Sequence, residues 1–326
     1  MIHKRCNLMS SEKKVKEKKA EEVIQKILDL RDKGETREEL KYVSKLRSPI
    51  VSRFEKIKHK IAVMSGKGGV GKSTVATNLV AAFKAEGYNC GILDADVHGP
   101  NVPKMMGLHE KYPDFKGRTF YPLETEEGIK VWSVALYWPS DSTPVMWRGP
   151  YKTRVIKQFL AAVDWGELDY LIIDLPPGTG DEPQTIIEKI PELDGVVIVA
   201  TPQEVALLDV RKSGEMVKEM SVPVLGVIEN MSAHAICPNC GEILKCANCG
   251  NQVEFFGEGG AELASEELEV PFLGSIPVDP RIRTSGDEGT PFVLKYPDSE
   301  AAKNFREIVR KIEKELEKHK PSSEGE

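Results

Sequence analysis

No stretch of this sequence approaches the roughly 18 consecutive apolar residues that a membrane-spanning helix needs. The first residues, Met1–Arg5, lead into polar sequence, and no apolar region of signal-peptide length follows them. No internal repeat of solenoid length is present either. We therefore expect a cytoplasmic protein without a membrane partner.

Basic residues are not in excess. The chain carries 45 Lys and Arg residues against 51 Asp and Glu residues, which gives a net charge of −6 at pH 7. General nucleic-acid binders carry a basic surface that neutralises phosphates. The local basic run Lys13–Lys19 is interleaved with other residues, including glutamate, as on a solvated helix face. No nucleic-acid partner is therefore expected.

Cysteine is scarce outside one short window. Of six cysteines, Cys6 and Cys90 stand alone and the other four lie within residues 237–249. A disulfide framework would spread its cysteines over a small secreted chain, so this distribution excludes one. The clustering indicates a metal site.

The middle of the chain alternates between two kinds of segment. From residue 60 onward, short apolar runs rich in β-branched residues are separated by helical stretches. The runs are apolar throughout, as in strands covered on both faces of a parallel sheet. We predict an α/β fold with a doubly wound, mainly parallel sheet. The predicted strands contain Ile61–Met64, Gly91–Leu93, Leu171–Ile173, Val196–Ala200, Val224–Ile228 and Phe272–Ile276.

Additions flank and interrupt this pattern. Residues 10–48 have the spacing of two helices, the second ended by Pro49, and we assign residues 1–55 to a helical N-terminal arm. Runs Thr119–Leu123 and Ile129–Val134 flank an acidic turn and predict a hairpin inserted after the second strand. A final helix over about Ser299–Lys318 is predicted to turn one apolar face to the core. That face comprises Phe305, Ile308, Val309, Ile312 and Leu316.

A phosphate-binding motif follows the first predicted strand. The segment Gly66–Thr74 matches G-x-x-x-x-G-K-[ST] at every required position, between an apolar run and an amphipathic stretch. Its glycines let backbone N–H groups wrap around phosphates, the helix N-terminus adds positive potential, and Lys72 adds a full charge. Ser73 is placed to bind Mg²⁺ through its hydroxyl. The predicted nucleotide-binding residues are Gly66, Lys67, Gly68, Gly69, Val70, Gly71, Lys72, Ser73 and Thr74.

Carboxylates follow two predicted strands, at the edge where α/β sheets place their ligands. Asp174 ends one apolar run and fits the role of holding Mg²⁺, usually through water. Asp94 and Asp96 follow another run on the same face. Asp94 would support the metal shell, and Asp96, further out, would orient the attacking water. Each acid could instead merely cap the next helix.

The clustered cysteines form two C-x₂-C pairs, Cys237 with Cys240 and Cys246 with Cys249, each followed by glycine. Such a pair forms a tight knuckle whose sulfurs converge on one metal, and two knuckles supply a complete tetrahedral site. Thiolate sites of this kind suit zinc and iron–sulfur clusters alike. The spacing taken alone favours a structural zinc site.

Linked motifs give the chain a wider resemblance. Lys67, the second residue of the loop, is typical of the deviant Walker A class of dimeric P-loop NTPases. Over about residues 58 to 310 the chain resembles the Mrp/Nbp35 family of iron–sulfur cluster carrier and scaffold ATPases. The matching segments are Gly66–Thr74, Asp94–Pro103, Trp147–Pro150, Asp169–Asp181, Thr201–Val205, Glu229–Ser232 and Cys237–Cys240.

The resemblance implies a homodimer that binds ATP and hydrolyses it slowly. By position, Lys67 would reach the phosphates bound in the other subunit, Lys72 would serve its own, and Asn230 would recognise the adenine edge. The segment after Asp96 would sense the γ-phosphate. Family members use a Cys-x-x-Cys at this place. Two such pairs from two chains would hold one [4Fe–4S] cluster, which passes to apo iron–sulfur proteins.

The second pair, Cys246 and Cys249, departs from the single pair typical of the family. All four thiolates could therefore close a site within one chain. The sequence predicts a P-loop ATPase domain over residues 56–320, a metal-binding insertion at 237–250 and a disordered tail at 321–326. Two alternatives to a cluster carrier stay open. One is a zinc-stabilised ATPase switch, and the other is a partition or septum-positioning ATPase with the same Lys67-type loop.

Overall fold

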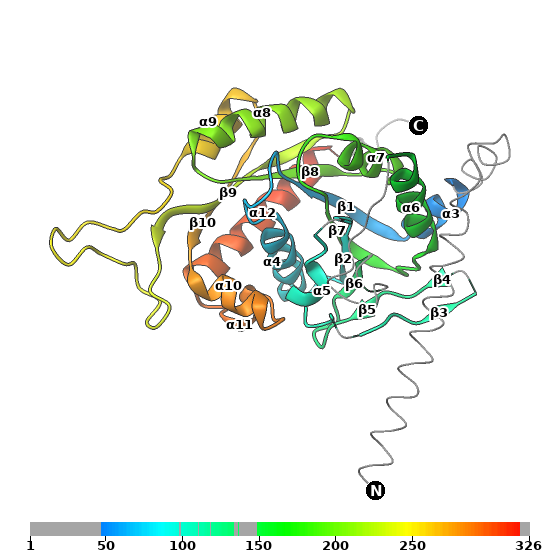
Figure 1. Ribbon diagram of the computed structural model, residues 1–326, viewed down its shortest axis with the longest axis horizontal. Coiled ribbons are helices and arrows are strands. Elements are labelled where there is room, and N and C mark those ends of the chain that lie inside the picture. The colour runs from blue at the N-terminus through cyan, green and yellow to red at the C-terminus, as the bar shows by residue number, and fades with distance from the viewer. Residues whose placement is uncertain are drawn as a thin grey trace, which may run out of the picture.

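The computed structural model describes residues 47–97, 99–109, 111–117, 119–133, 136 and 149–319. Within this part, helices cover both faces of a central sheet, and an arm extends from one side (Figure 1). The two helices predicted over residues 10–48, apart from 47 and 48, lie outside it, as does the predicted tail at 321–326. The domain boundaries at 55 and 320 therefore stay predictions.

The sheet is mainly parallel, as predicted. The described residues form an eight-stranded sheet of order β10-β9-β8-β1-β7-β2-β6-β5 and a separate ribbon of β3 and β4. Only the pairing of β5 with β6 in that sheet is antiparallel. All six predicted apolar runs lie within its strands. The strands are β1 (Ile57–Met64), β2 (Cys90–Asp94), β3 (Phe115–Lys116), β4 (Thr119–Phe120), β5 (Leu123–Glu124), β6 (Lys130–Ser133), β7 (Leu168–Asp174), β8 (Gly195–Ala200), β9 (Val224–Ala235) and β10 (Phe272–Val278).

Helices pack against both faces, so the fold is doubly wound. They are α3 (Arg47–Phe54), α4 (Lys72–Ala85), α5 (Val102–Met105), α6 (Gly149–Ala162), α7 (Asp181–Lys189), α8 (Glu204–Glu219), α9 (Gly260–Glu267), α10 (Pro280–Asp287), α11 (Phe292–Lys295) and α12 (Glu300–His319). Ile61 and Val63 of β1 share a core with α4, α11 and α12. Ala62 and Met64 face the other core, with α3 and α6 to α9. Alternate residues of one strand thus serve two cores, which explains the continuously apolar runs.

The C-terminal helix α12 confirms the predicted amphipathic pattern. Its five predicted core residues are all buried against the sheet. All of its charged residues lie at its remaining positions, and most of them are exposed. No helix among the described residues is both long and apolar enough to cross a membrane.

The predicted hairpin is only partly correct. Leu123–Glu124 does pair antiparallel with Lys130–Ser133 across the acidic turn. However, β6 also pairs in parallel with β2, so the hairpin is the edge of the main sheet and not an insertion. Thr119–Phe120 pairs elsewhere, with Phe115–Lys116. Val131 and Trp132 of β6 are buried, and that burial draws this strand into the sheet.

Pro49 does not end a helix, contrary to the prediction. It lies within α3, whose Ile50 and Phe54 are buried in one of the two cores. Proline is tolerated in the first turn of a helix because its missing N–H has no intrahelical partner there. A helix is therefore present near this position, but it runs from Arg47 to Phe54 and does not end at Pro49.

Candidate functional site

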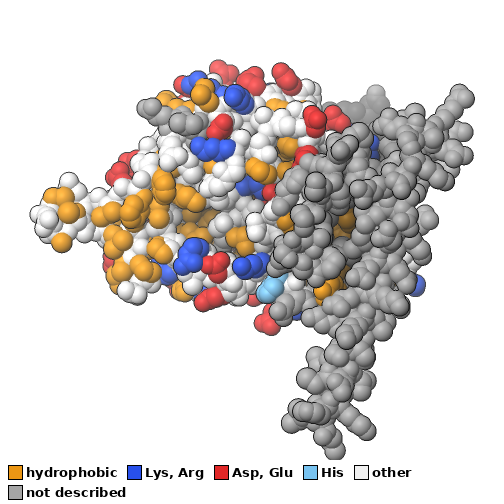
Figure 2. Space-filling view, viewed as in Figure 1, with side chains coloured by type: hydrophobic (Ala, Val, Ile, Leu, Met, Phe, Trp, Pro, Cys, Tyr) orange, Lys and Arg blue, Asp and Glu red, His pale blue; other side chains and the backbone are white. Residues whose placement is uncertain are grey.

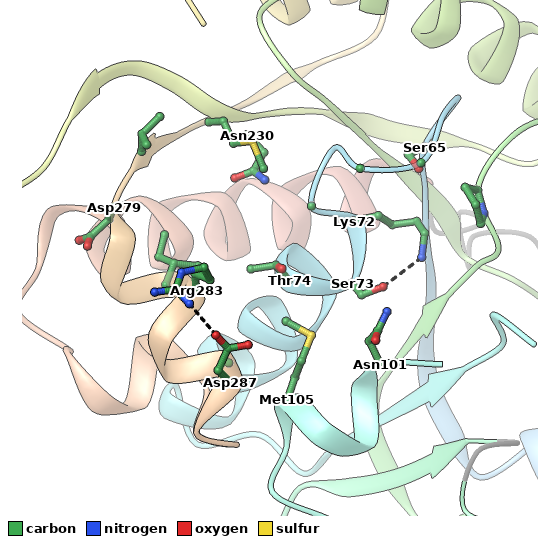
Figure 3. A pocket seen from close by; sticks show the side chains of 18 of the residues that line it. Ser65, Lys72, Ser73, Thr74, Asn101, Met105, Asn230, Asp279, Arg283 and Asp287 are labelled. Atoms are coloured by element: carbon green, nitrogen blue, oxygen red, sulfur yellow. Dashed lines mark hydrogen bonds and ion pairs between the residues drawn. The ribbon is translucent and has the colours of Figure 1, made fainter. Parts of the chain in front are cut away.

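The phosphate-binding loop lies between β1 and α4, at the carboxyl edge of the sheet. Gly71 caps α4 with a φ of 83°. A Cβ at this position would lie 2.2 Å from Nδ2 of Asn230, so both the backbone conformation and the close approach require glycine. The loop lines a cavity of about 630 Å³, which is within the size range of ligand pockets (Figure 3).

Lys72 and Asp174 form a buried ion pair beside this loop. Nζ of Lys72 lies 2.6 Å from Oδ1 of Asp174 and also donates to Oγ of Ser73 at 3.4 Å (Figure 3). Burial raises the pKa of Asp174, and the Lys72 ammonium opposes that rise. The second carboxylate oxygen, Oδ2, is buried without a hydrogen-bond partner among the described residues. An unpaired carboxylate oxygen near a serine hydroxyl fits the oxygen ligands that Mg²⁺ prefers.

Asp94 is buried, and its carboxylate accepts hydrogen bonds from the loop that follows it. Its Oδ1 accepts from the backbone N–H of Asp96 at 3.2 Å, and its Oδ2 accepts from Oγ of Ser133 at 3.0 Å and the N–H of Val102 at 3.3 Å. Burial raises the pKa of Asp94 well above its ordinary value, and the Asp174 carboxylate adds to the rise. Asp94 therefore orders the loop between β2 and α5. Its part in a metal shell stays a prediction.

Asp96 lies on the cavity wall, unlike Asp94. Its Oδ1 accepts from the backbone N–H of Gly99 at 3.1 Å, which fixes the carboxylate relative to the loop. This position is compatible with the predicted role of orienting a water molecule, and that role stays a prediction.

Lys67 and Asn230, whose roles follow from the resemblance, both line the cavity. Nζ of Lys67 lies 3.8 Å from Oδ2 of Asp209 on α8, and the side chains are 34% and 26% exposed. A part-exposed ion pair of this kind contributes little to the stability of the fold, so breaking it to move Lys67 elsewhere costs little free energy. Nδ2 of Asn230 donates to the carbonyl of Val70 at 2.9 Å, which ties β9 to the loop.

The wall opposite the loop was not predicted from the sequence. It is formed where β10 enters α10, and Figure 3 shows Asp279 and Arg283 across the cavity from Lys72 and Ser73. Asp279 caps α10, its carboxylate accepting from the N–H of Arg281 at 2.9 Å. An acid followed by proline at the first helical position is a capping signal that was available in the sequence.

The four cysteines lie on the arm that leaves the body after β9 (Figure 1). A bridge between His234 and Glu254 holds its two limbs together. We call residues 237–241 the first knuckle and residues 246–250 the second knuckle. Both are tight turns: the N–H of each final glycine donates to the carbonyl of the first cysteine, at 2.9 Å and 2.8 Å respectively.

Backbone N–H groups turn towards one sulfur in each knuckle. Those of Cys240 and Asn239 lower the pKa of the Cys237 thiol. Those of Cys249 and Asn248 lower the pKa of Cys246 in the same way. Donors arranged like this stabilise thiolates, the form that binds metal.

The knuckles stand as two separate pairs. No three or more His, Cys, Asp or Glu side chains of the described residues gather as a possible metal site. The four thiolates therefore do not form one closed site as the arm is folded here. Each knuckle offers half of a tetrahedral site.

Glu229 is a buried carboxylate to which the sequence reasoning gave no role. It accepts from the hydroxyl of Ser232 and from the N–H groups of Gly259, at 3.0 Å, and Ala261, at 2.8 Å. It therefore joins the root of the arm to the start of α9. In the sequence, Glu229 stood out only as part of Glu229–Ser232, one of the segments that carry the family resemblance.

Comparison with known proteins agrees with this geometry. A ParA family model described as NUBPL iron-transfer P-loop NTPase matches residues 56–313. The iron–sulfur cluster carrier protein of Methanocaldococcus jannaschii is 49% identical over 268 residues, covering 82% of this chain and 88% of that protein. The carrier protein of Pyrococcus horikoshii is 48% identical over 285 residues, covering 84% and 92%.

Solved structures show the same fold. A nucleotide-binding protein from Archaeoglobus fulgidus in complex with ADP has a TM-score of 0.61 and 38% identity, covering 74% of this chain and 91% of that one. The septum site-determining protein MinD of Pyrococcus horikoshii, complexed with Mg-ADP, has a TM-score of 0.53, covers 78% and 96%, and shares the fold alone at 23% identity. The chain belongs to the family of iron-transfer P-loop NTPases that includes the iron–sulfur cluster carrier proteins.

Proposed function

We propose that this chain is an ATPase that binds an iron–sulfur cluster through its C-x₂-C cysteines and transfers it to apoproteins. The observation that carries the proposal is that the cavity and the cysteine arm share strand β9, which pairs with β10. β9 supplies Asn230 to the cavity and continues into the arm, and β10 leads into the cavity wall at Asp279. A ligand in the cavity would therefore contact the strand from which the cysteine arm begins.

ATP with Mg²⁺ is the proposed nucleotide. Its phosphates would lie along the loop, where Lys72 would exchange part of its pairing with Asp174 for phosphate oxygens. Ser73 and Asp174 would hold Mg²⁺, which neutralises charge on the phosphates when bound. Asn230 would contact the adenine edge, and its bond to Val70 keeps the amide in place for that contact.

Hydrolysis is proposed to be slow, as in a switch. Asp96 would orient a water molecule towards the γ-phosphorus, and cleavage of the bond to the β-phosphate oxygen would give ADP and phosphate. Asp96 belongs to the loop between β2 and α5. Loss of the γ-phosphate would therefore change the conformation of that loop.

The proposed assembly is a cytoplasmic homodimer. Hydrophobic side chains gather where the arm joins the body (Figure 2). Phe256 lines the cavity and is 40% exposed, and Leu208, next to Asp209 on α8, is 56% exposed. Exposed apolar side chains around a cavity favour a protein contact there. A second copy seated on this face would bring Lys67 towards the phosphates of its partner.

A homodimer also supplies the ligands that a cluster needs. A [4Fe–4S] cluster takes four thiolates, and each knuckle supplies two. Corresponding knuckles of two chains would complete one site across the interface. Because neither chain holds the cluster alone, separation of the chains would release it, which suits a carrier and its apoprotein recipients.

Cluster transfer is the direct test. The protein would be loaded with iron and sulfide without oxygen, then mixed with an apo-ferredoxin whose [4Fe–4S] absorbance reports transfer. We expect transfer that depends on the knuckle cysteines and changes with ATP. A tightly held zinc ion that survives ATP turnover, with no cluster formed, would favour the zinc-stabilised switch instead. Salt-dependent binding to DNA or anionic vesicles would favour a partition-type ATPase.

A further inference from the structure

The two knuckles differ in how they contact the body. The backbone N–H of Ile236, the residue before the first knuckle, donates to the carbonyl of Val278 at 2.9 Å. Val278 directly precedes Asp279, and both residues line the nucleotide cavity. The first knuckle therefore begins one hydrogen bond away from the cavity wall.

Arg281 strengthens this connection. Its Nε donates to Oδ1 of Asp279 at 3.0 Å and its Nη2 donates to Oδ2 at 2.7 Å, a two-pronged contact with a carboxylate that is 1% exposed. Arginine bound in this way is held in a defined orientation. Its guanidinium carbon also lies 5.1 Å from the ring centroid of Tyr296, which caps the end of α11.

The same guanidinium meets the first knuckle. A Cβ placed on Gly241 would lie 3.3 Å from Nη1 of Arg281, so the final turn of the knuckle rests against this side chain. One side chain thus contacts both the cap of the cavity wall, Asp279, and the turn that carries two thiols.

Within the part of the chain that the structure describes, the second knuckle lacks such a contact. A Cβ on Gly250, the counterpart of Gly241, would meet no atom within 4 Å. The bonds from Cys246 to Asn251 and from Gly250 to Cys246 stay within its own hairpin. Figure 1 shows one tip of the arm near α10 and α11 and the other pointing away from the body.

From these contacts we infer that Arg281 is a positioning residue that makes the first knuckle, and not the second, respond to the nucleotide in the cavity. The inference rests on the proposed binding of nucleotide at this site. A ligand that shifts the wall at Asp279 moves Arg281 with it, and the Cys237–Gly241 turn follows. The second knuckle keeps its conformation and its thiols stay accessible in every nucleotide state.

Site-resolved alkylation tests this division. The reduced, metal-free full-length protein is pulsed with iodoacetamide without nucleotide, with MgADP, and with Mg²⁺ and a non-hydrolysable ATP analogue. Mass spectrometry then gives the rate at each cysteine. We expect nucleotide to change the rates at Cys237 and Cys240 by about fivefold or more, the lower end of typical coupling between sites. The rates at Cys246 and Cys249 should not change.

Variants separate positioning from binding. Arg281→Gln should remove the nucleotide response of the first knuckle while the affinity for a fluorescent ADP analogue stays the same. Arg310→Gln is the matched control, since Arg310 pairs with Glu86 on the surface at 3.7 Å, and it should behave as the unaltered protein does. Thermal unfolding of each variant checks that it is folded.

The possible results have distinct meanings. An unaltered protein that binds nucleotide but shows no change at the first knuckle, or equal changes at both knuckles, overturns the inference alone. A full response in Arg281→Gln also overturns it. Failure of the unaltered protein to bind nucleotide overturns the proposed function and this inference with it.

Discussion

The ammonium of Lys72 and the carboxylate of Asp174 lie 2.6 Å apart, and both side chains are almost completely buried. The pair joins the start of α4 to the end of β7, so it holds the phosphate-binding loop against the central strands. Only Oδ1 of Asp174 takes part in this ion pair, and Oδ2 has no hydrogen-bond partner among the described residues. The same two residues that stabilise the loop are the ones that we propose bind a phosphate and a hydrated cation.

Lys72→Ala would remove the charge that faces a bound phosphate and leave Asp174 buried without its partner. Removing one member of a buried ion pair costs roughly 3–5 kcal/mol, so the free energy of unfolding should fall and nucleotide binding should be lost. Titration with a fluorescent ATP analogue and thermal unfolding measure both effects. Lys58→Ala is the control, because Lys58 pairs with Asp169 on the surface. An unchanged ATP affinity in Lys72→Ala would refute the loop assignment.

Lys67→Ala should act on assembly more than on binding. Lys67 pairs only weakly with Asp209, so its loss should leave nucleotide affinity and stability nearly unchanged. If Lys67 serves the partner's phosphates, the variant should lose ATP-dependent dimerisation and turnover. Analytical ultracentrifugation with a non-hydrolysable ATP analogue, together with phosphate release, measures the two. A variant that dimerises and turns over normally would refute the role across the interface.

Asp94→Asn tests a pH dependence. Burial raises the pKa of Asp94 above its ordinary value of 3.8, so above that pH the folded state keeps a proton that the unfolded state has released. The free energy of unfolding contributed by this group therefore falls as pH rises towards the folded-state pKa. Asparagine does not titrate, so the variant should gain stability relative to the unaltered protein as pH rises above about 4. Urea unfolding across this range measures the difference, and a flat or falling difference would contradict the burial argument.

Thiol reactivity should divide the described cysteines into two groups. Burial raises the pKa of Cys90 to about 12, whereas backbone N–H groups lower the pKa of Cys237 and Cys246. At mildly alkaline pH the knuckle thiols should react with iodoacetamide in the native protein, and Cys90 should react only after unfolding. Peptide mapping with and without denaturant measures this. Rapid labelling of native Cys90 would contradict its buried position in the core.

Elements with a local signal could be predicted from the sequence. The loop from Gly66 to Thr74, the six strands and the buried face of α12 each depend on residue types within a few positions of one another. Each was found where the pattern placed it. The paired cysteines were likewise recognisable from their spacing.

Features that depend on distant contacts could not be predicted. β6 joins the main sheet because it pairs with β2, and nothing in the turn at its start indicates that partner. No sequence pattern reveals that Asp94 accepts a hydrogen bond from Ser133 on another strand. The contact between Arg281 and the Gly241 turn joins residues far apart in sequence, so no spacing rule could have found it.

The central claim is that cysteines of this chain hold a cluster under the control of a nucleotide. Anaerobic quantification of iron and sulfide tests it most directly, on protein reconstituted in parallel with Cys237→Ser/Cys240→Ser and Cys246→Ser/Cys249→Ser variants. The account predicts iron and sulfide in equal amounts on the unaltered protein, and loss of both when the cysteines of the first knuckle are replaced. Zinc without sulfide, or a cluster content that is the same in all three proteins, would contradict it.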